Sequence, residues 1–330
     1  MLLLQSLNIN SISESEWAHL YNIHLKINEK YGFLNLPGHV EIYIKQKKLR
    51  YQEGGANQLS IILNGEEIIG IIERWEDYDW GGNPEIKVIC NVLFDDIPEE
   101  CYRLLEDYLK ASLDKYNRLT LLSHNSELNQ ILTSFTWKSQ LKEVFWSIKQ
   151  EDLDRQKLTE WIQEVSANNR GLTLRFFNTV PDELLDQYSE LFMDTAEDMP
   201  ETYEPAFVPF VIDAKKQKER NENFKKAGLI HKWCGVFNEV GKLVAMSNVR
   251  YYEQDTRYIY QFMISTTREF RGRKLGRWLY AAMYLKLLSE IPDFELIYLF
   301  HHPENVPAYS LSQRTGFQKG YAEDFIILEK

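Results

Sequence analysis

A basic turn with two glycines, at residues 271–276, is the part of the sequence best suited to bind an anion. It reads Arg-Gly-Arg-Lys-Leu-Gly, follows an aromatic and β-branched run at 258–264, and precedes apolar residues at helical spacing. A strand should therefore lead through this turn into a helix. A helix N-terminus offers unpaired N–H groups and the positive end of its dipole, and glycine lets a phosphate approach closely. The turn thus predicts a pyrophosphate site, with a plain helix cap as the alternative.

A second motif begins at Asn305, which lies 34 positions beyond Arg271. It has the pattern Asn-x-x-Ala-x-x-Leu-x-x-x-x-Gly-Phe and ends at Phe317. Pro307 suits the first turn of a helix that Asn305 would open. The apolar run 295–300 predicts a strand between the two motifs.

Together the two motifs resemble those of the GNAT superfamily of acyl-CoA-dependent N-acyltransferases, whose pyrophosphate loop reads Q/R-x-x-G-x-G/A. Arg271 and Gly276 fit the first and last positions of that loop, whereas Lys274 stands where the middle glycine is usual. The resemblance covers residues 172–330 and implies acetyl-CoA as the co-substrate. The cofactor contacts that it implies come from Phe262, Met263, Ile264, Arg271, Gly272, Arg273, Lys274, Leu275, Gly276, Asn305 and Ala308.

The resemblance also implies where acyl transfer would occur. The N–H groups of residues 262–264 would bind the carbonyl oxygen and the pantetheine arm. The superfamily's usual tyrosine, which protonates the departing thiolate, is replaced here by Ser312. Ser312 could relay a proton or simply lie inside the helix.

Two histidines are candidates for moving a proton. His301 and His302 follow the strand 295–300, and the carboxyl ends of strands are where open α/β sheets place ligands. Histidine titrates near neutral pH and could accept a proton directly or through water. The alternative is that both are solvated residues leading into Pro303. Glu253 and Asp255 lie in an expected hairpin turn, which favours solvated turn residues over a base.

The acceptor site is expected beside an acidic stretch, residues 193–205, which contains no Lys or Arg. Carboxylates there could hold a cationic amine, or they could belong to an acidic surface loop. The candidate residues are Asp194, Glu197, Asp198, Glu201 and Glu204. The basic run 215–226 is most simply a solvated helix face.

The two halves of the chain share one order of predicted elements. Strand pairs at 59–75 and 232–252 are each followed by a strand, a helix and further strands. This order predicts an α/β (α+β) fold with two tandem GNAT-like domains, each a mixed, mostly antiparallel sheet flanked by helices. We place the domains at 1–150 and 171–330, with a linker helix at 151–170.

The first half lacks an equivalent of the basic turn. Its strand-to-helix junction carries Asp95 and Asp96 and no glycine. Carboxylates at a helix N-terminus occupy the dipole end and repel a pyrophosphate. We therefore expect 1–150 to be a degenerate copy, with an unconventional CoA site as the alternative.

Composition limits the partners and the location. The chain has 49 acidic and 38 basic residues, a net charge of −11, which disfavours nucleic acid and suits cationic ligands. The scattered Cys90, Cys101 and Cys234 argue against a disulfide framework and a cysteine-based metal site. No apolar run approaches the roughly 20 residues that span a bilayer. We predict a cytoplasmic monomer or homodimer with no metal and no membrane partner.

The function that these features favour is an N-acetyltransferase. It would move an acetyl group from acetyl-CoA to an amine of a cationic small molecule, such as an amine-bearing antibiotic in self-resistance. The missing tyrosine and middle glycine favour a different class, a catalytically inactive acyl-CoA sensor or scaffold. Release of CoA in the presence of an acceptor would distinguish the two.

Overall fold

The computed structural model describes residues 2–31, 39–52, 58–78, 84–93, 99–112, 116, 118–123, 128, 138–197 and 213–329. The chain forms two compact units. Within the described residues, unit 1 takes Met1–Glu143 with Ala322–Lys330, and unit 2 takes Val144–Glu201 with Val211–Tyr321.

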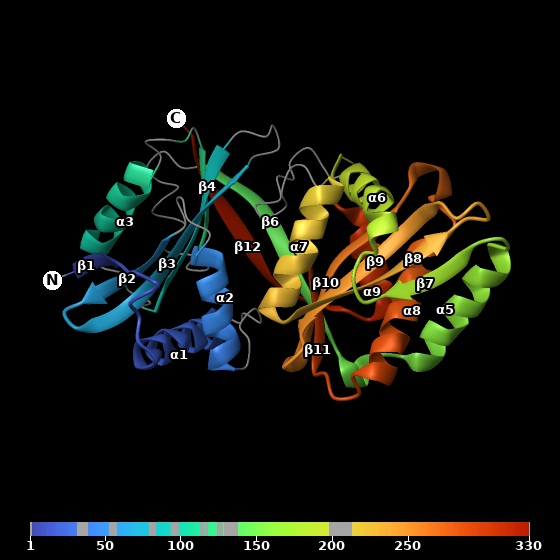
Figure 1. Ribbon diagram of the computed structural model, residues 1–330, viewed down its shortest axis with the longest axis horizontal. Coiled ribbons are helices and arrows are strands. Elements are labelled where there is room, and N and C mark those ends of the chain that lie inside the picture. The colour runs from blue at the N-terminus through green and yellow to red at the C-terminus, as the bar shows by residue number, and fades with distance from the viewer. Residues whose placement is uncertain are drawn as a thin grey trace. The chain divides into compact units, whose positions relative to one another are not determined.

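Unit 1 is a mixed sheet between helices (Figure 1). Its strands are β1 (Leu2–Ser6), β2 (Gln58–Asn64), β3 (Glu67–Tyr78), β4 (Pro84–Val92), β5 (Arg118–Leu122) and the end of β12 (Gln318–Glu329), in that spatial order. Its helices are α1 (Glu14–Tyr31), α2 (Val40–Gln52) and α3 (Glu99–Ser112). Only β4 and β5 run parallel among these described pairs.

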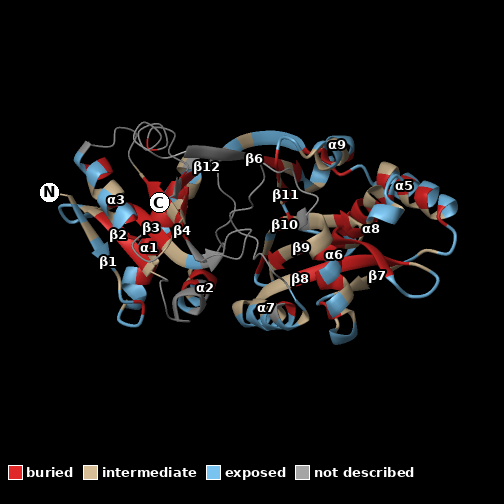
Figure 2. Cartoon of the chain, turned by 90° about the horizontal axis from the view of Figure 1, so that it is seen from above, coloured by how far each residue is buried: buried red, intermediate tan, exposed pale blue. Residues whose placement is uncertain are grey.

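Local sequence signals account for much of unit 1. The turn between β2 and β3 contains Gly65 at φ 65°, a left-handed conformation that glycine adopts without strain. At the start of α1, the Ser13 N–H donates to Glu16 and the Glu16 N–H donates to the Ser13 hydroxyl, which is a capping box. α3 shares one apolar cluster with β3–β5, whereas α1 and α2 share another with β2 and β3. The sheet is therefore covered on both faces, and its strands are largely buried (Figure 2).

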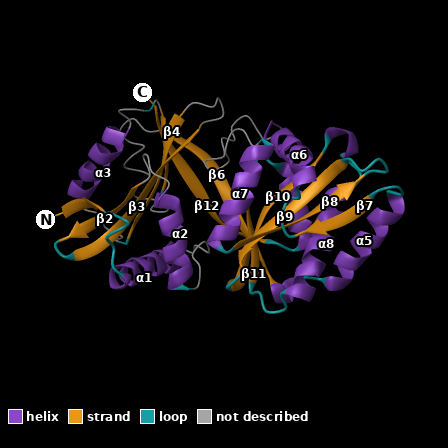
Figure 3. Cartoon of the chain, viewed as in Figure 1, coloured by secondary structure: helices purple, strands orange, loops and turns teal. Residues whose placement is uncertain are grey.

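Unit 2 repeats this arrangement. Its strands are β6 (Lys138–Lys149), β7 (Thr173–Phe177), β8 (Leu229–Phe237), β9 (Leu243–Tyr252), β10 (Asp255–Thr266) and β11 (Leu296–His301), in the order β6-β11-β10-β9-β8-β7. Its helices are α5 (Arg155–Asn168), α6 (Leu185–Glu197), α7 (Ala214–Ala227), α8 (Leu275–Glu290) and α9 (Val306–Thr315). α5 and α8 cover one face of the sheet, and α6 and α7 the other (Figures 1 and 3).

Each half of the sequence gives its last strand to the other unit. Residues 144–149 of β6 pair with β11, and residues 325–329 of β12 pair with β5. In both units the parallel strand thus gains an antiparallel neighbour from the other half of the chain. In each unit, mixed strand pairing with flanking helices confirms the predicted fold class.

Among the described residues, no helix is both long and apolar enough to cross a membrane.

Candidate functional site in unit 2

The basic turn leads into α8 as predicted, and its backbone has an unusual conformation. Gly272 has φ 78°, and Lys274 has φ 62° and is the N-cap of α8. Of the described residues, Lys274 is the one non-glycine residue with positive φ. A left-handed backbone is strained for a residue with a Cβ, which explains why the superfamily's loop usually has glycine at this position. The side chain of Lys274 forms an ion pair with Glu164 of α5 and gives α8 no side-chain cap.

Gly276 lies in the first turn of α8 and packs tightly against two neighbours. A Cβ built on it would lie 3.2 Å from Cδ2 of Leu311 on α9 and 3.5 Å from Cδ1 of Ile264 on β10. Arg271, Gly272, Arg273 and Lys274 are exposed, whereas Leu275 is buried. The turn therefore presents basic side chains and an uncapped helix start to solvent, while Gly276 lets α8 approach α9 and β10.

Strands β10 and β11 part beside this helix start. Their parallel pairing joins residues 258–260 to 296–298 and, among the described residues, does not extend past Tyr260 and Tyr298. Both strands continue, because β10 pairs with β9 up to Thr266 and β11 pairs with β6 up to His301. The edge of β10 at residues 262–264 that faces β11 is thus left without a strand partner.

A bulge shifts the register of β10 at Phe262. Gln261 pairs with Val249, but Met263 pairs with Asn248, so Phe262 is the extra residue. The buried side chain of Gln261 holds this shape. Its Nε2 donates to the carbonyl oxygens of Asn248 at 3.0 Å and Met263 at 2.9 Å, and lies 3.1 Å from the Ser247 hydroxyl.

Two buried hydrogen bonds lie near the bulge and near His301. The Tyr284 hydroxyl donates to Oε1 of Gln261 at 3.2 Å, and the ring centroid of Tyr280 lies 5.0 Å from that of Tyr284. The hydroxyl oxygen of Ser312 lies 2.6 Å from Nε2 of His301. Sequence reasoning missed Tyr280 and Tyr284, whose four-residue spacing on a helix otherwise signals packing.

The structure brings His301 and Ser312 together and buries them both. Exposures of 9% for His301 and 7% for His302 contradict the solvated alternative. Burial lowers the pKa of His301 to about 4, with a partly offsetting hydrogen bond to the Phe300 backbone, so its imidazole is neutral at neutral pH. Burial also lowers the pKa of His302, whose Nδ1 accepts the N–H of Glu304 at 3.2 Å.

The second motif forms the expected helix. Asn305 is the N-cap of α9, and its side-chain oxygen accepts the N–H of Ala308 at 3.3 Å. Pro307 lies in the first turn, and Gly316 ends the helix at φ 112°. The motif thus fixes α9 against β11 and places Ser312 on its inward face.

Of the predicted acidic segment, the structure describes only its start. Asp194 is partly exposed on α6, and Glu197 is the last residue of that helix. Asp198, Glu201 and Glu204 lie outside the described residues.

Two expectations about charged residues were wrong. Asp255 is 7% exposed rather than solvated, and both its oxygens accept hydrogen bonds from Arg257. The helix α7, predicted from residues 215–226, is not uniformly solvated either, because Arg220 lies over the rings of Phe192, Phe224 and Phe262. The sequence shows that residues 215–226 are rich in charge, but it does not show which of their side chains point inward.

Comparisons with known proteins agree with this geometry. Residues 188–317 match the model of the acetyltransferase (GNAT) family. Similar solved structures include a tandem GNAT protein from the clavulanic acid biosynthesis pathway, 16% identical, with a TM-score of 0.76 over 100% of this chain and 98% of that one. A GCN5-related N-acetyltransferase from Sphaerobacter thermophilus is 10% identical, with a TM-score of 0.66 over 99% of this chain and 95% of that one. No curated protein matches the sequence.

The chain is thus a tandem GNAT protein in fold, and residues 188–317 carry a domain of the GNAT acetyltransferase family. The family match of this domain supports an acyl-CoA-dependent acyltransferase with acetyl-CoA as its co-substrate. The predicted superfamily, enzyme class and co-substrate are confirmed.

Proposed function

We propose that unit 2 transfers the acetyl group of acetyl-CoA to an amine of a cationic small molecule. The observation that carries this proposal is the parting of β10 and β11 past Tyr260 and Tyr298, beside the uncapped start of α8. An exposed strand edge can bind an extended amide-bearing arm, and a basic helix start can bind its pyrophosphate. These two features fit the two ends of acetyl-CoA.

The roles of the chain's own residues follow from this fit. Acetyl-CoA supplies an activated thioester. Residues 271–276 bind the pyrophosphate, and Asn305 and Ala308 open α9 beside the pantetheine arm. The N–H groups of Phe262, Met263 and Ile264 are shared between the carbonyl oxygen, where negative charge develops during acyl transfer, and the pantetheine arm. The bulge that Gln261 holds turns this edge of the strand toward the ligand.

The pair of His301 and Ser312 serves proton transfer. Because burial keeps His301 neutral, it is a weak base for a solvated ammonium at neutral pH. The hydrogen bond between His301 and Ser312 is better suited to relaying a proton to the departing thiolate. His302 is the second candidate for accepting the proton of the amine, directly or through water.

The cationic character of the acceptor rests on charge. The chain carries a net charge of −11, and the carboxylates that we propose for the acceptor are Asp194, Asp198, Glu201 and Glu204. Their combined field would concentrate a cation. An amine-bearing antibiotic is one such acceptor, and its acetylation would serve self-resistance.

We further propose that 171–330 is the catalytic domain and 1–150 a degenerate copy, joined by the helix at 151–170. The acidic junction that supports this, Asp95 with Asp96, lies outside the described residues. Because β5 pairs with residues 325–329, a fragment of residues 1–150 would lack a strand of its own sheet. Activity is therefore tested on the full chain.

The experiment incubates the protein with acetyl-CoA and a panel of polyamines and aminoglycosides, and measures CoA release with a thiol reagent. Release with at least one amine is the expected result. Tight acetyl-CoA binding without release from any acceptor would instead favour an inactive sensor.

A further inference from the structure

Two arginines of unit 2 lie over the same aromatic ring. Arg250, on β9, places its guanidinium carbon 3.5 Å from the ring centroid of Phe262, and Arg220, on α7, lies 5.4 Å from it. Both also lie over Phe224, at 4.8 and 5.4 Å. Two like charges are thus held close together between a helix and the sheet.

No carboxylate of the described residues pairs with either arginine. The Nε and Nη2 atoms of Arg250 are buried and have no hydrogen-bond partner in the part of the chain that the structure describes. Burial lowers the pKa of both guanidinium groups, that of Arg250 to about 9, where repulsion from Arg220 also contributes. A buried cation without a counter-ion is strongly unfavourable, and the described residues supply no anion to balance these two.

The polar neighbours do not supply that anion. The Tyr188 hydroxyl lies 3.3 Å from Nε2 of His231 and accepts a hydrogen bond from Asn248 at 3.0 Å. Burial raises the pKa of Tyr188, and burial together with the two arginines lowers the pKa of His231. Both groups are therefore neutral near neutral pH.

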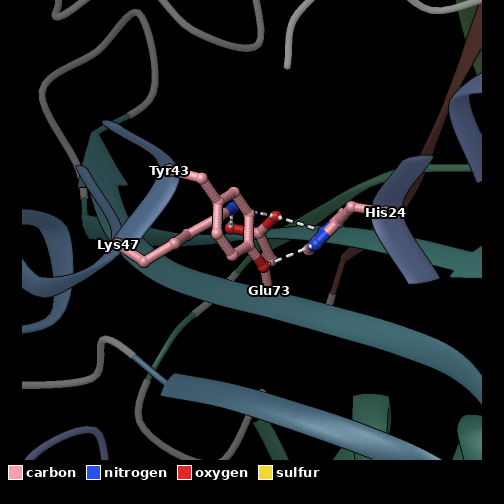
Figure 4. Close-up of polar contacts among 4 residues, drawn as sticks. All are labelled: His24, Tyr43, Lys47 and Glu73. Atoms are coloured by element: carbon pink, nitrogen blue, oxygen red, sulfur yellow. Dashed lines mark hydrogen bonds and ion pairs between the residues drawn. The ribbon is translucent and has the colours of Figure 1, made fainter. Parts of the chain in front are cut away.

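In unit 1, the equivalent helix and strand carry a cation and an anion that neutralise each other (Figure 4). There Lys47, on α2, lies 2.5 Å from both carboxylate oxygens of Glu73 on β3. His24 Nε2 lies 3.3 Å from Glu73, and its Nδ1 lies 2.6 Å from the Tyr43 hydroxyl. By element order, α2 and β3 correspond to α7 and β9. The equivalent helix–strand pair in unit 2 carries two cations instead of an ion pair.

We propose that Arg220 and Arg250 form a subsite for an oxyanion group, a carboxylate or a phosphate, of the acceptor molecule. Phe262 connects the subsite to the reaction, because its ring faces both arginines and its backbone forms the bulge of β10. Assigning the oxyanion to the acceptor rests on the proposed function. It narrows the acceptor to an amine that also carries an acidic group.

The test measures anion binding by thermal unfolding, without acetyl-CoA. The probes are phenylacetate and phenylphosphate, with the neutral phenylacetamide as a matched compound. Saturating anion should raise the Tm of the wild type by about 2–4 °C or more, whereas phenylacetamide should not. Arg250→Met should abolish the rise and Arg220→Met should reduce it, since a charged hydrogen bond contributes about 10–100-fold in affinity. Lys225→Met, an exposed change on α7, is the control and should keep the rise.

The unliganded variants separate binding from a structural role. Methionine keeps an apolar stem over the rings and removes an uncompensated charge, so Arg250→Met should unfold at the same Tm as the wild type or higher. A lower Tm for the unliganded variant would mean that Arg250 is structural, and the proposal would be wrong. It would also be wrong if neither anion stabilised the wild type, or if Arg250→Met kept the full rise.

Calorimetry with CoA and 3′-dephospho-CoA identifies the source of the oxyanion. If Arg250→Met keeps the wild-type preference between CoA and 3′-dephospho-CoA, the result supports the assignment of the oxyanion to the acceptor. Loss of that preference would assign the arginines to the cofactor phosphate and overturn the assignment to the acceptor. Because the anion probes need no catalysis, an anion-dependent Tm rise in a protein that releases no CoA would refute the proposed function alone.

Discussion

The imidazole Nε2 of His301 lies 2.6 Å from the hydroxyl oxygen of Ser312, and both side chains are buried. The contact joins the end of β11 to the middle of α9. The two proton-transfer candidates are therefore held together inside unit 2 rather than at its surface.

Removal of the Ser312 hydroxyl should impair catalysis more than binding. Ser312→Ala leaves His301 without this partner, so kcat should fall about 10–100-fold if the pair transfers a proton. Affinity for acetyl-CoA should not change, and stability should fall by about 1–3 kcal/mol. Steady-state kinetics and calorimetry measure these effects. Ser289→Ala, an exposed change on α8, is the matched control, and equal kcat in both variants would refute the relay.

The left-handed backbone at position 274 should determine which residues are stable there. Since φ is 62°, Lys274→Gly should relieve strain, whereas Lys274→Ala should keep it. We expect the glycine variant to be more stable than the alanine variant by about 1 kcal/mol in urea unfolding. Both variants lose the ion pair with Glu164 equally, so their difference isolates the backbone. Equal stability of the two variants would mean that the turn changes conformation and relieves the strain at position 274.

Gly276→Val should weaken acetyl-CoA binding. The added side chain crowds Leu311 and Ile264 and projects at the helix start that the pyrophosphate would approach. Calorimetry should show at least a tenfold loss, about 1.4 kcal/mol. Gly276→Ala should lose less, and Tm measurements on both variants check that the domain still folds. Unchanged affinity in a folded Gly276→Val protein would contradict the assignment of this turn.

The ion pair between Lys47 and Glu73 in unit 1 should stabilise the fold because each buried charge neutralises the other. Glu73→Gln removes the carboxylate that neutralises the buried Lys47 and should cost about 3–5 kcal/mol of stability. The double variant Lys47→Met with Glu73→Leu removes both charges and should be far less destabilised. Urea unfolding measures both. If the double variant were as unstable as Glu73→Gln, His24 and Tyr43 would depend on Glu73 for more than charge balance.

Stability should fall as the pH drops below the ordinary pKa of histidine. Burial lowers the pKa of His24, His231, His301 and His302 in the folded chain. The unfolded chain therefore binds protons first, from about pH 6.5 downward, whereas His301 stays neutral when folded until about pH 4. Each such histidine removes up to about 1.4 kcal/mol per pH unit. Urea unfolding at pH 7.5, 6.5 and 5.5 should show this decline, and constant stability would contradict the burial of these side chains.

The sequence alone determined the features that depend on near neighbours along the chain. The capping box at Ser13 and the N-cap at Asn305 form between residues three positions apart. The turn from β10 into α8 follows from glycine positions and apolar periodicity. The repeated order of elements predicted the tandem fold, and the resemblance of two motifs to those of the GNAT superfamily implied acetyl-CoA as the co-substrate.

The tertiary structure decided what depends on distant segments. Nothing in the sequence predicts that β12 pairs with β5, because strand pairing is set by which sheet edge can bury an apolar strand. The contact between His301 and Ser312 joins β11 to α9, and Arg220 meets Arg250 over the ring of Phe262 across 30 positions. Burial changes the chemistry of such groups. It keeps His301 neutral, and it holds two arginines together with no counter-ion among the described residues. Burial is a property of the packed fold rather than of any local pattern.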